Sequence, residues 1–190
     1  MIDETFHPRQ QQAADALIRC FENGGKVLLC GNGGSSADCA HIAGELLKGF
    51  LKKRPVPTAL LEQVPQAASL QCGLPAIDLT AQAAAISAAA NDLGGETVFA
   101  QQVLAYGRPG DVLIGISTSG NAANVDLAMR VARARGLTTI GLSGASGGRL
   151  RETADILLNV PETETYLVQE KHLPLYHAIC AAVEAHFFAE

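Results

Sequence analysis

The chain lacks several features that would place it in a membrane, outside the cell or on nucleic acid. No apolar run approaches the ~20 residues of a membrane-spanning helix. No basic segment followed by an apolar one opens the sequence, so we expect no export and a cytoplasmic location. Lysine and arginine number 14 against 19 acidic residues, and this net charge of −5 disfavours an extended nucleic-acid surface.

Cysteine is sparse and has no pairing pattern. The five cysteines are odd in number and show no CxxC spacing, which favours reduced thiols in a cytoplasm over a disulfide framework. The positions are Cys20, Cys30, Cys39, Cys72 and Cys180.

Length and patterning predict one α/β domain covering residues 1–190. The chain is 48% hydrophobic and has no internal repeat or linker. Short β-rich runs alternate with helical segments, which is typical of a parallel sheet with helices on both faces. We expect a five-stranded, flavodoxin-like, doubly wound sheet in which the first and third strands are neighbours. The expected strands are 27–30, 74–79, 112–117, 138–142 and 156–160; the expected helices are 8–24, 37–50, 122–135 and 165–188.

Residues 52–73 interrupt this pattern. They carry three prolines after a basic triplet, and they predict either a mobile excursion or a short extra helix near 58–64.

Two Gly/Ser loops, each between an apolar strand and a helix, are the strongest functional signal. Such loops place backbone N–H groups and small hydroxyls at the positive end of a helix, which suits a phosphate group. Neither loop has the spacing of a Walker A or dinucleotide-binding motif. We therefore expect a phosphorylated small molecule as ligand. The candidate contacts are Asn32, Gly33, Gly34 and Ser35 in the first loop, and Ser117, Thr118, Ser119 and Asn121 in the second.

Acid–base and metal-binding side chains occur at helical spacing. His41 and Glu45 share one face of the helix after the first loop. Gln169, His172, Tyr176 and His177 are expected on one side of the last helix. These groups have the chemistry of an acid–base pair or a metal site, although each is also acceptable as a polar surface residue. Residues 91–95, which include Asn91 and Asp92, predict a turn.

Several blocks, in order along most of the chain, resemble the sugar isomerase (SIS) domain family in its phosphoheptose isomerase branch. The longest are Cys30 to Glu45 and Gly110 to Asn124. The others are Arg54-Pro55, Asn91 to Gly94, Leu142 to Gly148, and Val168 to His172 with His177.

The resemblance implies a ketose–aldose isomerase that converts sedoheptulose 7-phosphate to D-glycero-D-manno-heptose 7-phosphate through a cis-enediol, for bacterial surface glycans. It implies Glu45 and His177 as the catalytic pair. It further implies a homotetramer with shared active sites and one zinc ion per subunit. Implied phosphate contacts are Ser35, Ser117, Thr118 and Ser119; implied further substrate contacts are Asn91, Asp92 and Gln169; implied zinc ligands are His41, Glu45, Gln169 and His177.

The chain departs from the family pattern outside the acid–base pair. The 52–73 segment is about twenty residues longer than usual, Tyr166-Leu167 replaces an acidic–basic pair, Gly49 stands where an arginine is usual, and Ala122 replaces a serine. These changes leave open another sugar phosphate as substrate. A non-catalytic SIS protein that binds the replication initiator, or a sugar-phosphate sensor, would need neither Glu45 nor His177.

Overall fold

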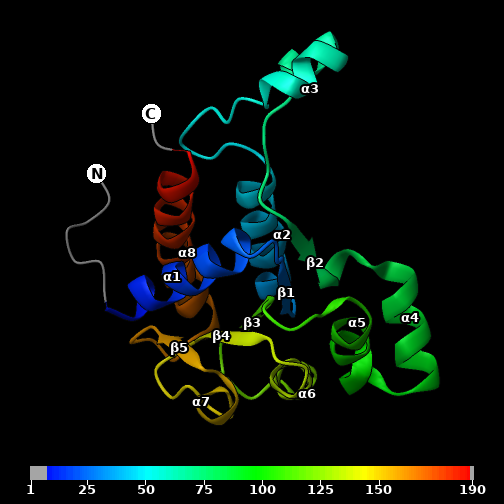
Figure 1. Ribbon diagram of the computed structural model, residues 1–190. Coiled ribbons are helices and arrows are strands. Elements are labelled where there is room, and N and C mark those ends of the chain that lie inside the picture. Colours follow the sequence, from blue (N-terminus) through cyan, green and yellow to red (C-terminus); the bar gives the residue numbers. More distant parts are fainter. Residues whose placement is uncertain (1–7, 189–190) are drawn as a thin grey trace.

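The fold is built on one parallel sheet, seen in the computed structural model, which describes residues 8–188 (Figure 1). The strand order is β2-β1-β3-β4-β5, and every neighbouring pair is parallel. The first and third strands are therefore adjacent, as predicted, with Val27 opposite Val112 and Gly31 opposite Ile116. The strands are β1 (Val27–Gly31), β2 (Ala76–Asp78), β3 (Val112–Ile116), β4 (Thr138–Ser143) and β5 (Ile156–Asn159).

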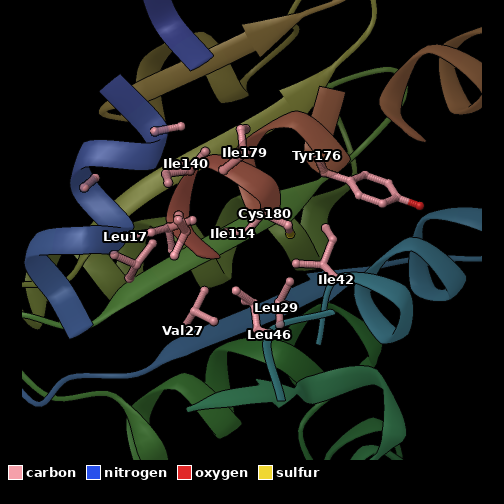
Figure 2. Close-up of a cluster of buried hydrophobic side chains, with 14 of the residues drawn as sticks. Leu17, Val27, Leu29, Ile42, Leu46, Ile114, Ile140, Tyr176, Ile179 and Cys180 are labelled. Atoms are coloured by element: carbon pink, nitrogen blue, oxygen red, sulfur yellow. The ribbon is translucent and has the colours of Figure 1, made fainter. Parts of the chain in front are cut away.

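Helices cover both faces of the sheet because successive strand residues point to opposite sides. Val27 and Leu29 pack into a core with α1, α2 and α8, which Figure 2 shows in close-up. Leu28 and Cys30 pack into a second core with α4, α5 and α6 on the other face. The doubly wound prediction is confirmed. The helices are α1 (Pro8–Glu22), α2 (Gly34–Leu47), α3 (Thr58–Gln63), α4 (Ala83–Asp92), α5 (Val98–Tyr106), α6 (Ala123–Ala134), α7 (Leu150–Thr153) and α8 (Thr165–Phe187).

Two predicted boundaries differ from the structure for identifiable reasons. The second strand has only three residues, because Pro75 has no N–H for the ladder and Asp78 already accepts a hydrogen bond from the N–H of Thr80 (2.8 Å) to begin a 3-10 turn. Helix α2 begins at Gly34, three residues earlier than predicted, so Gly34 and the two serines of the first loop lie in its first turn.

The 52–73 excursion carries the predicted short helix. It contains α3 and the 3-10 helix η1 (Pro65–Ser69), and these lie far from the sheet in Figure 1. Helix α3 has no buried residue. The ends of the excursion meet, because the N–H of Cys72 donates to the carbonyl of Arg54 at 2.8 Å.

Among the described helices, none is both long and apolar enough to cross a bilayer.

Candidate active site

A cavity of about 310 Å³ lies at the carboxyl ends of β1 and β3. This is the edge at which doubly wound sheets bind ligands, because the crossovers leave β1 and β3 in opposite directions. The lining includes most of the residues that the two loops predicted. The lining residues are Asn32, Gly33, Gly34, Ser35, Ile116, Ser117, Thr118, Ser119, Ala122, Thr165 and Gln169.

Three helices begin at this cavity. Gly34 is the first residue of α2, Ala122 immediately precedes α6, and Thr165 is the first residue of α8. Each helix start carries about half a positive charge, although the N–H groups of Ser35 and Ser36 in α2 already donate to the carbonyls of Asn32 and Gly33. No lysine or arginine is among the lining residues. An anion here would therefore be held by backbone N–H groups, hydroxyls and amides.

Two successive glycines of the first loop shape the cavity wall. Gly33 has a φ of 57°, in the left-handed region that favours glycine. At Gly34 a Cβ atom would collide with the side-chain amide of Gln169. Gln169 thus reaches from α8 to the start of α2, so the amide and the loop form one wall of the cavity.

Amide side chains join the two loops. The amides of Asn32 and Asn124 donate to each other's oxygens, both at 2.9 Å. In the second loop, the side chain of Asn121 donates to the carbonyl of Ser119 at 3.0 Å and accepts from the N–H of Arg149 at 3.2 Å. Asn121 thereby holds the loop, and it is not among the residues that line the cavity.

A cluster of His41, Glu45 and His177 lies further along α2 from the cavity, with His177 contributed by α8. Nε2 of His41 is 3.0 Å from Oε1 of Glu45 and 3.3 Å from Nε2 of His177. One ligand atom from each of the three residues lies within 4.8 Å of the other two. Two imidazoles and a carboxylate at this spacing are a donor set that suits zinc.

The surroundings of His177 favour its neutral form. Burial lowers the pKa of His177, and the nearby His41 lowers it further, against the opposing charge of Glu45. The imidazole also packs beside the Phe50 ring, with centroids 5.2 Å apart. A neutral imidazole can both accept and donate a proton or bind a metal.

Some predicted site residues lie apart from both groups. Asn91 and Asp92 are exposed at the end of α4, where the amide of Asn91 donates to Asp92 at 2.7 Å, and neither lines the cavity. His172 is fully buried, and among the described residues its ring nitrogens have no hydrogen-bond partner. The last helix therefore divides its polar residues: Gln169 lies at the cavity, whereas Tyr176 and His177 contact His41.

Sequence reasoning missed two residues of this region as candidates. Asn124 lies just beyond the second loop, inside a block that carried the family resemblance, and Thr165 follows the acidic stretch before α8. A polar residue at the start of a helix that faces a phosphate loop is the signal that could have identified both.

Comparisons with known proteins show which family this chain resembles. The SIS domain family matches residues 2–72 and 64–144. The chain is 44% identical over 190 residues to phosphoheptose isomerase of Burkholderia pseudomallei (strain 1710b), which covers all of this chain and 88% of that protein. The structure of phosphoheptose isomerase GmhA from Neisseria gonorrhoeae matches with a TM-score of 0.77 and 40% identity, covering 92% of this chain and 85% of that one. The chain belongs to the SIS domain family.

A further structure supports the same branch of the SIS family. Phosphoheptose isomerase from Francisella tularensis matches with a TM-score of 0.81 at 35% identity, over 96% of this chain and 88% of that one. The predicted family and the predicted SIS fold are confirmed.

Proposed function

We propose that this SIS protein is a ketose–aldose isomerase that converts sedoheptulose 7-phosphate to D-glycero-D-manno-heptose 7-phosphate, for heptose synthesis in the cytoplasm. The observation that carries the proposal is the pairing of an anion cavity with an acid–base cluster on the same helix. The relatives named phosphoheptose isomerase, which align over the whole chain, support the choice of substrate.

The spacing of the two parts fits a sugar of this length. Ser35 and His41 are six residues apart, hence about 9 Å along the axis of α2. An extended seven-carbon ketose 7-phosphate spans about 8 Å from C2 to phosphorus, at about 1.2 Å per bond as in an extended chain. A phosphate at Ser35 would then bring the reacting carbons to the level of His41, whose Nε2 lies 3.0 Å from Glu45 and 3.3 Å from His177.

The chemistry of isomerisation assigns roles to these side chains. One group must take a proton from the carbon beside the carbonyl and return it to the neighbouring carbon, while another moves a proton between the two oxygens. The carboxylate of Glu45 suits the first task, and the neutral imidazole of His177 suits the second. Binding of the remote phosphate would orient the sugar for both transfers.

We propose zinc as the cofactor, held by His41, Glu45 and His177, with Gln169 as the fourth candidate ligand. The convergence of three ligand atoms within 4.8 Å supports this site. Zinc bound there supplies a Lewis acid that polarises a carbonyl oxygen. Gln169 is two helical turns from His177 and packs against Gly34, so as a ligand it would have to reach from the cavity wall.

We also propose a homotetramer whose subunits share active sites. Asp92, implied as a substrate contact, lies outside the cavity of its own chain. Exposed apolar side chains also lie just after α4 and on α5, and their burial against another subunit would offset the cost of association. These are Leu93, Leu104 and Tyr106.

The test of the reaction is turnover of sedoheptulose 7-phosphate in deuterated water, with added zinc and with chelator. Incorporation of deuterium beside the carbonyl would establish proton transfer with solvent exchange. Glu45→Gln should lower kcat by about 10²- to 10⁴-fold while inorganic phosphate still binds. The exposed Glu152→Gln is the matched control. Near wild-type turnover of Glu45→Gln would remove Glu45 as the base.

The test of shared sites mixes two inactive variants. If Asp92 serves another subunit's site, unfolding and refolding Asp92→Asn together with Glu45→Gln will restore part of the activity, because some sites then receive both native residues. Activity that stays at the level of the separate variants would show that each site uses residues of one chain.

A further inference from the structure

The hydroxyl of Tyr176 lies between a histidine of the cluster and a carboxylate. It is 3.0 Å from Nδ1 of His41 and 3.3 Å from Oδ1 of Asp38. Tyr176 is only 3% exposed. Figure 2 shows its ring at the edge of the apolar core, with the hydroxyl directed out of that core. The tyrosine thus connects Asp38 to the side of His41 that faces away from Glu45.

The chemistry of the three groups sets the direction of the hydrogen bonds. An ionised carboxylate only accepts, so the hydroxyl of Tyr176 donates to Asp38. A tyrosine hydroxyl has an ordinary pKa of about 10 and keeps its proton near neutral pH. Oδ2 of Asp38 is buried without a partner, so the bond from Tyr176 to Oδ1 is the one hydrogen bond that this carboxylate receives among the described residues. The oxygen of Tyr176 is then free to accept from Nδ1–H of His41.

A neutral imidazole carries one proton, so a proton on Nδ1 leaves a lone pair on Nε2. That lone pair faces Oε1 of Glu45 at 3.0 Å, which only accepts, and Nε2 of His177 at 3.3 Å, so a cation held by Nε2 would satisfy the contact. We propose that Asp38 and Tyr176 are positioning residues that hold His41 in the Nδ1–H tautomer, so that Nε2 is available as a metal ligand. This inference rests on the proposed zinc site, and it adds Asp38 and Tyr176 as the residues that orient the ligand His41.

The opposite arrangement has a distinct consequence. If Tyr176 donated to Nδ1, the tyrosine oxygen would face the Asp38 oxygen at 3.3 Å without a proton between them. The Nε2 atom of His41 would then carry the proton and donate to Glu45, which blocks it as a ligand. The two arrangements therefore differ in which ring nitrogen of His41 carries the proton, and this can be measured.

The first experiment measures the tautomer directly in metal-free protein labelled with ¹⁵N-histidine, at a pH where the imidazoles are neutral. Long-range ¹H–¹⁵N spectra distinguish a protonated ring nitrogen from an unprotonated one, and His41→Gln assigns the signals. We expect the Nδ1–H tautomer in the wild type. In Asp38→Ala the hydroxyl has lost its acceptor and can donate to His41, so the proton should move to Nε2. In Tyr176→Phe the acceptor for Nδ1–H is lost and Glu45 remains as an acceptor for Nε2, so the proton should again move to Nε2.

The second experiment measures zinc affinity by competition with a chelator. Loss of a group that orients a metal-bound histidine costs about 10- to 100-fold in affinity, and we expect this loss in both Asp38→Ala and Tyr176→Phe. The control Tyr106→Phe removes a partly exposed hydroxyl on α5 and should bind zinc like the wild type. Thermal unfolding of each variant separates a folding defect from a changed tautomer, and both variants keep an aromatic ring at position 176.

The outcomes separate this inference from the function on which it rests. A wild-type His41 with its proton on Nε2, or a tautomer unchanged in Asp38→Ala, would overturn the inference. Zinc affinity unchanged in both variants would overturn it as well. If the wild type shows the expected tautomer and its reversal in Asp38→Ala but binds no zinc, the positioning role is supported and the proposed metal is wrong.

Discussion

Nε of Arg54 donates to Oε1 of Glu184 at 2.9 Å, and both side chains are only 1% exposed. Arg54 also donates to the carbonyls of Leu46 (2.6 Å) and Glu45 (2.8 Å) in the last turn of α2. This places a cation at the negative end of that helix. Glu184 accepts in addition from three successive N–H groups, of residues 50–52. The pair thus links α8 to the end of α2, beside the proposed base.

We predict that Arg54→Met lowers the free energy of unfolding by about 3–5 kcal/mol, because it leaves the buried Glu184 without its counter-charge. Urea unfolding measures this. The matched control is Arg133→Met, whose partner Asp155 is 39% exposed at the side chain and whose loss should cost at most about 1 kcal/mol.

The double variant Arg54→Met/Glu184→Leu distinguishes charge pairing from backbone satisfaction. It removes both charges but leaves two carbonyls and three N–H groups without their partners, so most of the loss should remain. Full recovery of stability would show that the charges alone matter.

We predict that Gly34→Ala weakens phosphate binding, because its Cβ would displace the amide of Gln169 from the cavity wall. The control is Gly44→Ala on the same helix, where a Cβ meets nothing within 4 Å and should stabilise α2 by up to about 1 kcal/mol. Isothermal titration with inorganic phosphate and thermal unfolding give the two readouts. Equal phosphate affinity in both variants would show that the Gln169 amide takes no part in the cavity.

The main helices and strands could be predicted from their patterns of apolar residues, and so could the placement of β1 beside β3. Alternation of apolar residues with helical segments fixes the parallel sheet, and sheet order fixes where the two loops meet. The proximity of His41 and His177 required the resemblance as well, since nothing in local spacing relates α2 to α8.

Two features could not be predicted because they depend on tertiary packing. The polar face expected on α8 is divided: His172 is buried beside β4, whereas His177 approaches α2. The roles of Asn121 and Asn124 also depend on partners distant in sequence, Arg149 and Asn32.

We predict that the buried His172 makes the fold sensitive to acid. Burial lowers the pKa of His172, and the nearby backbone of Ser143 offsets only part of this. The unfolded chain, with an ordinary histidine pKa of about 6.5, therefore binds the proton first as the pH falls. The contribution to stability is complete above pH ~6.5 and is lost below it, by up to about 1.4 kcal/mol per pH unit.

The measurement is urea unfolding of wild type and His172→Leu between pH 8 and pH 5. The variant has no proton to bind at this position, so its stability should decline less over that range. The comparison uses each protein's own value at pH 8 as reference, which removes any packing effect of leucine. Parallel declines would contradict the assignment to His172.

We predict that replacing residues 57–70 with a short turn leaves the domain folded. The ends of the excursion are already joined at Cys72 and Arg54, α3 buries no side chain and η1 buries only Ala67, so the change in unfolding free energy should stay within about 1 kcal/mol. Helix α2 has 14 residues, which puts the start of the excursion about 20 Å from the cavity. The excursion extends away from the sheet in Figure 1 and does not cover the cavity of its own chain, so the KM for the sugar phosphate should not rise through loss of a lid. Light scattering gives the second readout: a lower mass would identify the excursion, with its exposed Leu60 and Leu70, as a contact between subunits. A raised KM at unchanged mass would contradict the prediction and identify the segment as a lid.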